Sequence, residues 1–391
     1  MDTKLRPLIN EQKHLGCTKP SQLIATLFSD HLHPMTLESV RNGALGAFQS
    51  GNLAIHAIGK GYAALNGSAL KHGIKQSDRL LSNHHFDTWG FFTPWVRFLA
   101  SGRPELVVAL DWTDFDKDDH TTLALYLVTR HGRSSPLLWM TVRKSELADH
   151  RNEHEFTLID HLHSLLPPEV CVTLLADRGF GDHKLYGHLE ALGWDYVIRF
   201  RGNIHVEHEG VTKPASEWVA TNGRKTKLEK AKVTHQKAEV PCVVTVKAAK
   251  MKEAWCLASS LSEKKAEEIV ALYAKRFTIE ETFRDTKDIH FGMGLSATHI
   301  KDPKRRDRLM MLAAIAYALL TLLGAASEKS GLDKTLSSSA KKKRTMSLYR
   351  QGKFWFEVLD STRPEWRERL MAAFEEVLQE HAQLREIYGV I

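Results

Sequence analysis

The sequence predicts a mixed α/β protein, in which helices pack on a sheet of mixed strand direction. Three observations point to this class. Short apolar runs typical of buried strands begin at residue 105, amphipathic helical segments alternate with the later runs, and a basic stretch with strand-like alternation interrupts the pattern. Helical regions are expected at both ends of the chain. At roughly 100–200 residues per domain, the 391 residues should form two or three domains.

The first hundred residues favour helices. Apolar residues recur at spacings of three and four in 22–32 and in 37–65. Further along, Lys71, Lys75 and Arg79 are four residues apart, so a helix there would carry them along one side. A solvated charged face is the ordinary explanation of that spacing, and contact with a polyanion is the alternative.

Between residues 105 and 200 the pattern changes to strands with intervening helices. Continuous apolar runs indicate strands that are buried on both faces. The predicted strands cover 105–111, 121–130, 136–142, 170–177 and 195–200, and the predicted helices cover 153–166 and 182–194. A three-strand meander followed by two crossovers through helices predicts a mixed sheet.

A basic insertion follows. Residues 199–252 hold twelve Lys and Arg but five Glu, an excess equal to the net charge of +7 of the whole chain. Alternating sequence predicts that this insertion is mostly β, and a helix over 262–288 is expected after it. The predicted boundaries are 1–100 for the helical N-terminal region, 101–200 and 259–330 for the two parts of the sheet domain, 201–258 for the insertion and 331–391 for the helical C-terminal region.

One segment is apolar enough to resemble a membrane span. Residues 309–326 contain eighteen residues without a charge, which is the lower limit for crossing a bilayer. Tyr317, Thr321 and Gly324 interrupt this run, and no second span accompanies it. A buried, Ala-rich core helix is therefore the better interpretation, and no membrane contact is expected.

The composition excludes several other classes of protein. The four cysteines are scattered without a C-x-x-C pair, so a disulfide scaffold or a thiolate zinc site is not expected. Residues 150–154 spell H-x-x-E-H, but the motif crosses a loop-to-helix junction and lacks a further zinc ligand. The first sixteen residues lack the apolar run of a signal peptide, which favours a cytoplasmic location. Lys and Arg outnumber Asp and Glu by 54 to 47, which is consistent with a polyanionic partner.

Two predicted strands end in an aspartate, Asp111 and Asp177. If these strands are neighbours in one sheet, the two carboxylates lie together at its edge. Each aspartate alone has an ordinary explanation, because Asp is favoured where a strand gives way to a turn.

A stripe of polar residues on the 262–288 helix adds a third carboxylate. At 100° per residue, Tyr273, Arg276, Glu280 and Lys287 fall within about 60° of one another. A surface stripe of ion pairs would give the same spacing, because Arg276 and Glu280 form an i, i+4 pair. Helical geometry alone leaves both interpretations open.

The spacing of these four residues resembles the Y-R-E-K signature of cut-and-paste insertion-sequence transposases. The segments VVALDWTD around Asp111, LLADRGF around Asp177 and KRFTIEETFRDTK around Glu280 are similar to the three active-site blocks of that family, and IKQSDRLLSN at 74–83 extends the likeness. The resemblance covers most of residues 70–300. It implies a DDE enzyme with a ribonuclease H-like catalytic core.

The resemblance also implies a reaction and a set of metal ligands. Asp111, Asp177 and Glu280 would hold two divalent cations about 3.5–4 Å apart. Mg²⁺ is expected, with Mn²⁺ able to substitute, because carboxylate oxygens suit hard cations. The enzyme would cleave phosphodiester bonds and transfer a DNA strand without a covalent enzyme intermediate.

The same resemblance assigns DNA contacts. Tyr273, Arg276 and Lys287 would hold phosphates beside the scissile bond, and Trp255 would stack on a base flipped out of the duplex end. Lys75 and Arg79 would contact DNA from the N-terminal DNA-binding region. The expected partners are the double-stranded ends of the element and the target DNA, bound by a homodimer, which would associate with the nucleoid through its DNA.

Two alternatives stay open. A ribonuclease H-like nuclease without transposition would keep the three carboxylates but would not need end-specific binding. A non-enzymatic DNA-binding relic of a transposase would need neither metal nor cleavage.

Overall fold

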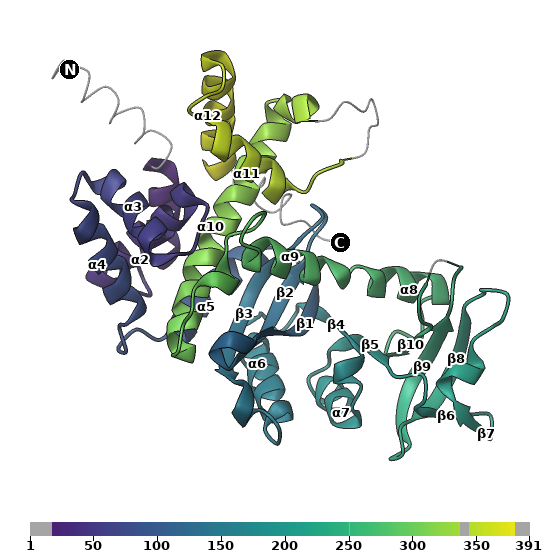
Figure 1. Ribbon diagram of the computed structural model, residues 1–391. Coiled ribbons are helices and arrows are strands. Elements are labelled where there is room, and N and C mark those ends of the chain that lie inside the picture. Colours follow the sequence, from purple (N-terminus) through teal and green to yellow (C-terminus); the bar gives the residue numbers. More distant parts are fainter. Residues whose placement is uncertain (1–17, 250, 337–343, 380–391) are drawn as a thin grey trace, which may run out of the picture.

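The computed structural model of the chain describes residues 18–249, 251–336 and 344–379. The expectations for the first sixteen residues and for the outer ends of the terminal regions therefore lie outside the described residues. Within the described part, the fold is the expected mixed α/β class, with one large sheet and helices at both ends (Figure 1).

Ten strands form a single mixed sheet in the order β3-β2-β1-β4-β5-β10-β9-β8-β6-β7. The strands are β1 (Glu105–Phe115), β2 (His120–Val128), β3 (Ser134–Arg143), β4 (Cys171–Ala176), β5 (Asp195–Phe200), β6 (His205–His208), β7 (Val211–Pro214), β8 (Thr226–Val233), β9 (Ala238–Val246) and β10 (Trp255–Ser259). β4 pairs in parallel with β1 and β5, and the other pairs are antiparallel. The predicted meander followed by two crossovers is confirmed.

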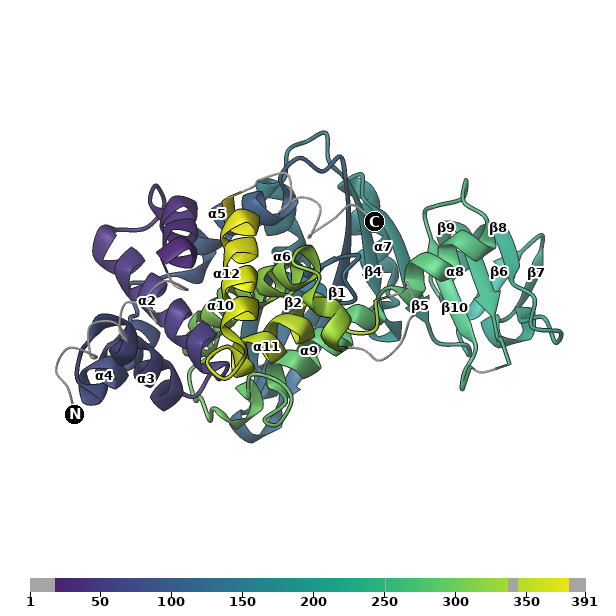
Figure 2. The ribbon, with the colours of Figure 1, turned by 90° about the horizontal axis from the view of Figure 1, so that it is seen from above.

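The insertion does not form a sheet of its own. β10 pairs with β5 on one side and with β9 on the other, so the strands of the insertion extend the central sheet. Figures 1 and 2 show these strands at one end of an elongated molecule and the N-terminal helices at the other.

Helices cover the sheet and build the two ends. They are a helix over 18–28 and then α2 (Pro34–Ser50), α3 (Ile55–Asn66), α4 (Leu70–Leu81), α5 (Thr88–Ala100), α6 (Arg151–Leu165), α7 (His183–Ala191), α8 (Ala266–Ala274), α9 (Phe277–Lys287), α10 (Pro303–Lys329), α11 (Leu348–Val358) and α12 (Pro364–Gln379). In Figure 1, α8 and α9 run along one side of the sheet and α6 and α7 lie on the other.

Three boundaries differ from the sequence prediction. The helical run 37–65 is two helices, because Gly51 adopts a left-handed conformation with φ of 58° and ends α2. The helix expected over 262–288 is also two, α8 and α9, because backbone bonds from Arg276 N to the Tyr273 carbonyl and from Ile279 N to the Arg276 carbonyl reach back three residues instead of four. β1 does not end at Asp111, since its antiparallel ladder with β2 continues to Phe115.

The apolar segment 309–326 lies in α10 and is a core helix. Among the described residues α10 is the one helix long and apolar enough to cross a membrane, and its most apolar window is entirely buried inside the protein. Asp302 caps its first turn by accepting hydrogen bonds from the backbone N–H groups of Lys304 and Arg305. Two glycines let α10 and α11 touch: a Cβ on Gly324 would lie 1.9 Å from the Leu348 carbonyl oxygen, and one on Gly352 would lie 1.8 Å from that of Leu320.

This crossing gives a test of the fold. Gly352→Ala should lower the free energy of unfolding by about 3 kcal/mol, because the added methyl group must push the two helix backbones apart. Gly187→Ala is the matched control: Gly187 lies in α7 with open space around its Cα, so alanine should stabilise the helix by up to about 1 kcal/mol. Chemical denaturation of both variants measures the difference, and equal effects would contradict the packing described.

Candidate active site

The register of two parallel strands places two aspartates side by side. Leu110 on β1 pairs with Ala176 on β4, so the next residues, Asp111 and Asp177, occupy neighbouring positions in one row. Adjacent strands are about 4.8 Å apart, and in-register residues of parallel neighbours point to the same face. Asp177 is held in place by its own turn, since its Oδ1 accepts a hydrogen bond from Gly179 N at 2.7 Å.

Helix α9 carries Glu280 to the same place. A polar seam seats α9 on the start of β3: Thr282 Oγ1 accepts from Ser134 N at 3.0 Å, and Thr278 and Ser134 share a hydrogen bond between their hydroxyl groups. One turn further along, the buried Asp285 pairs with Arg133 from the β2–β3 turn. These contacts fix the rotation of α9, with Glu280 half exposed on another face.

Arg276 lies between two of the three carboxylates. One of its guanidinium nitrogens, Nη1, is 3.2 Å from Asp111 Oδ2, and its other terminal nitrogen pairs with Glu280. Burial raises the pKa of Asp111 to about 7; Arg276 opposes this rise, while the negative charges of Asp177 and Glu280 add to it. The three carboxylates therefore lie close enough to act on one another, and a buried arginine is the counter-ion of Asp111 and Glu280.

The donor set fits a hard divalent cation, with one rearrangement. Carboxylate oxygens are the ligands that Mg²⁺ prefers. As the side chains stand, no group of three His, Cys, Asp or Glu among the described residues is arranged around a metal position, because Arg276 occupies the space between Asp111 and Glu280. Glu280 has a side chain that is 49% exposed, so it can reorient toward a cation without unpacking the core.

Tyr273 and Trp255 meet beside this arginine. Their rings contact edge to face with centroids 5.0 Å apart, and Phe277 stacks on Trp255 at 5.9 Å. Trp255 is partly exposed and Phe277 is exposed, but Tyr273 is buried, and burial raises its pKa to about 12. The predicted 60° stripe assumed one continuous helix. Tyr273 instead lies on α8 and Glu280 on α9, with a tighter turn at residues 274–277 between them, and the Trp255 ring packs against the buried tyrosine.

Lys287 is tied to the strand that carries Asp111. Its Nζ donates to Thr113 Oγ1 at 3.0 Å and to the Asp114 carbonyl at 2.6 Å, and it lies 4.5 Å from the centre of the Phe115 ring. Burial lowers the pKa of Lys287. The structure thus brings Asp111, Asp177, Glu280, Arg276, Tyr273, Lys287 and Trp255 to one side of the sheet.

Lys75 and Arg79 lie elsewhere, on α4 in the N-terminal helical region. Both are exposed, and the spacing predicted for them is confirmed as one side of a helix. Arg305 of α10 pairs with Asp78 at 2.6 Å and so attaches α4 to the core helix. Figure 1 shows α10 between α4 and the sheet.

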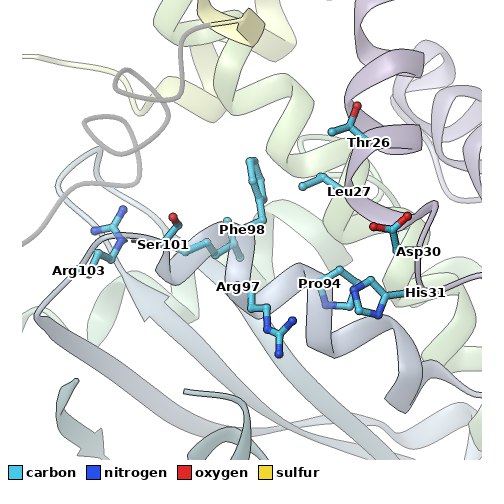
Figure 3. Close-up of a pocket in the computed structure, with 10 residues that line it drawn as sticks. Thr26, Leu27, Asp30, His31, Pro94, Arg97, Phe98, Ser101 and Arg103 are labelled. Atoms are coloured by element: carbon cyan, nitrogen blue, oxygen red, sulfur yellow. Dashed lines mark hydrogen bonds between the residues drawn. The ribbon is translucent and has the colours of Figure 1, made fainter. Parts of the chain in front are cut away.

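A surface pocket formed by described residues lies away from this site. A pocket of about 330 Å³ lies between residues 26–31 and the end of α5 (Figure 3). The side chains of Asp30, Arg97 and Arg103 point in different directions there instead of converging.

At the H-x-x-E-H segment, His150 precedes α6 and contacts Glu153 at 3.0 Å, so the expected loop-to-helix junction is confirmed.

Two arginines beside the site were missed by sequence reasoning. Arg178 directly follows Asp177, and Arg199 lies on β5, the next strand along; both pair with Glu253. Arg178 stands inside one of the quoted motifs, which could have singled it out. No sequence signal links either arginine to Glu253, because that contact joins residues 75 and 54 positions apart.

The fold and the site together define a mixed α/β protein with an acidic triad on one side of its sheet. The chain belongs to the family described as "Transposase DDE domain", whose model matches residues 102–319. It is therefore a transposase-type enzyme of the DDE class, a class that acts on DNA and generally uses divalent metals. No curated protein matches this chain.

The role of Arg276 as counter-ion can be tested by removing it. Arg276→Gln should destabilise the metal-free protein by about 3 kcal/mol, because the largely buried Asp111 carboxylate loses the cation that pairs with it. Added Mg²⁺ should recover part of that loss and raise the melting temperature more than it does in the wild type, where Arg276 competes for the same oxygens.

Arg284→Gln is the control, since Arg284 is an exposed residue of α9 paired with Glu281. It should cost less than about 1 kcal/mol and show the wild-type response to Mg²⁺. If Mg²⁺ stabilises the wild type, Arg276→Gln and Arg284→Gln equally, the carboxylates do not form the cation site.

Proposed function

We propose that this protein is a DNA transposase that binds the ends of its own element, cuts them and joins them to target DNA by metal-dependent cut-and-paste chemistry. The observation that supports this most strongly is the meeting of three carboxylates: Asp111 on β1 lies beside Asp177 at the end of β4, and Arg276 joins Asp111 to Glu280 on α9.

The three carboxylates would hold the divalent cations, two Mg²⁺ ions or Mn²⁺ in their place. When bound, the metal would activate a water or a DNA 3′-hydroxyl and stabilise the departing 3′ oxygen. The protein would position these ligands. Pairing of β1 with β4 fixes the register of two of them, and the hydrogen bond of α9 to the start of β3 fixes the third.

Tyr273, Arg276 and Lys287 would hold the phosphates on either side of the scissile bond. A guanidinium group binds phosphate through two parallel hydrogen bonds and an ammonium group acts as a point charge. With a cation held by Asp111 and Glu280, Arg276 would no longer be needed as their counter-ion and could turn to the DNA. Trp255 would stack on a flipped base, which its partly exposed ring allows.

The two ends of the molecule would bind duplex DNA. The N-terminal region, 1–100, would read the end sequence through α4, and the basic insertion, 201–258, would follow the backbone. The core, 101–200 with 259–330, would cut, and α11, from the proposed C-terminal region 331–391, would support the core by packing on α10. Because two ends must be brought together, a homodimer assembled on DNA is expected.

Cleavage tests the catalytic assignment. Glu280→Ala should abolish Mg²⁺-dependent cutting of end DNA while end binding stays, because alanine removes a metal ligand but little binding surface. Glu281→Ala is the matched control on the same helix, since its carboxylate pairs with Arg133 and Arg284 and not with Arg276. Gel assays of cleavage and binding report both properties, and normal cutting by Glu280→Ala would contradict the mechanism.

The same assay distinguishes the transposase from the two alternative functions. Joining of a 3′-hydroxyl to target DNA supports a transposase, cleavage without joining favours a nuclease, and binding without metal-dependent cleavage favours a DNA-binding relic.

Salt dependence tests the role of α4. Replacing both Lys75 and Arg79 with Gln should reduce the slope of log K against log salt by about 2, since each lost phosphate contact removes about 0.9. Lys184→Gln on α7 is the control, being exposed but on the far side of the sheet from the proposed DNA contacts, and it should leave the slope unchanged. Fluorescence anisotropy with end DNA measures the slopes, and an unchanged slope in the double variant would remove α4 from the interface.

A further inference from the structure

The row of site residues continues one strand past the two aspartates. Ala176 on β4 pairs in parallel with Ile198 on β5, so Arg199 follows in the row that holds Asp111 and Asp177. Neighbouring positions in such a row are about 4.8 Å apart and point to the same face. Arg178 is the residue directly after Asp177. Two guanidinium groups therefore lie at the edge of the proposed active site, on the side of the insertion.

A single carboxylate holds both arginines. Oε2 of Glu253, in the loop between β9 and β10, is 3.0 Å from Arg178 Nη1 and 2.8 Å from Arg199 Nη2. One negative charge thus faces two positive charges, and the cluster keeps a net positive charge. The Nε donor of Arg199 is buried and has no hydrogen-bond partner among the described residues.

The exposure of these side chains allows an exchange of partners. Glu253 and Arg178 have side chains 59% and 51% exposed, whereas Arg199 is 18% exposed. The Arg178–Glu253 pair is exposed, and exposed ion pairs contribute little to stability, so breaking this pair costs little. A phosphate offers several acceptor oxygens and matches the fork of each arginine better than one carboxylate oxygen does.

The neighbours of the cluster are residues already assigned to DNA. Glu253 lies two residues before Trp255, and Arg199 acts electrostatically on Tyr273. A DNA strand that runs from the carboxylates toward Trp255 would therefore pass over this pair of arginines.

We propose that Arg178 and Arg199 form a binding site for a DNA phosphate beside the active site, and that Glu253 occupies this site in the DNA-free protein. The inference rests on the proposed function, because it needs DNA at the carboxylates. In it, Glu253 acts as an internal competitor that restrains binding of DNA until a phosphate displaces its carboxylate.

The experiment measures how tightly variants with one charge removed bind duplex end DNA over a range of salt concentrations. Glu253→Gln should bind about threefold or more tightly than the wild type, because the competing charge is gone. Glu217→Gln is the control: it lies in the same insertion, is exposed and forms no salt bridge within the described residues, so its affinity should change less. Arg178→Gln should bind more weakly, with a salt slope smaller by about 0.9.

Three outcomes would overturn the proposal. Equal affinities for Glu253→Gln and Glu217→Gln would show that Glu253 does not compete with DNA, and a wild-type salt slope in Arg178→Gln would show that no phosphate binds there. If Glu253→Gln and Arg178→Gln lower the melting temperature equally and leave DNA affinity unchanged, the cluster is a structural clasp between the insertion and the core, which also overturns it.

Failure of the phosphate site and failure of the proposed transposase function give different results. If the wild type neither binds nor cuts end DNA, both the proposed function and the phosphate site fail. If the wild type binds and cuts while the variants at 178 and 253 behave like it, the phosphate site alone fails. The double variant Glu253→Gln with Arg178→Gln should lose the gain in affinity, which ties the effect of Glu253 to the arginine.

Discussion

Carboxylates in a partly buried space repel one another, and a fold that gathers three of them needs a cation in their midst. Here that cation is Arg276, which contacts Asp111 on β1 and Glu280 on α9. Even with the arginine present, burial holds the pKa of Asp111 at about 7. Under the proposed function, a divalent metal would supply the missing positive charge and take over the role of the arginine.

The surrounding structure serves to hold this group of charges in register. Parallel pairing of β1 with β4 fixes the positions of the two aspartates. The hydrogen bond of Thr282 to Ser134 and the ion pair of Asp285 with Arg133 hold α9 against β3 and so fix the position of the glutamate. α11 reinforces this contact from behind, since the Tyr349 hydroxyl donates to the Asp285 carbonyl at 3.3 Å. The N-terminal helices and the insertion lie at opposite ends of this centre (Figure 2), an arrangement that would suit the proposed binding of a DNA duplex.

Much of this arrangement could be predicted from the sequence, because local patterns carry it. Continuous apolar runs identified the strands. Eighteen uncharged residues predicted a long apolar helix, α10, and Tyr317, Thr321 and Gly324 within this run favoured a core helix over a membrane span. The family resemblance supplied the candidate carboxylates. What sequence reasoning missed depends on tertiary contacts. The turn between α8 and α9 contains neither Gly nor Pro, β1 outlasts Asp111 through its pairing with β2, and the link of Glu253 to Arg178 and Arg199 exists because β10 joins β5.

The central claim is that Asp111, Asp177 and Glu280 together bind divalent metal. Anomalous diffraction from crystals of the protein with end DNA and Mn²⁺ tests it most directly, since the signal locates the ion without reference to activity. The account predicts an anomalous peak in bonding contact with Asp111 and at least one of the other two carboxylates, and Arg276 turned from Glu280 toward the DNA. A peak that lies on none of the three, or an Arg276 still paired with both Asp111 and Glu280 beside bound DNA and metal, would contradict it.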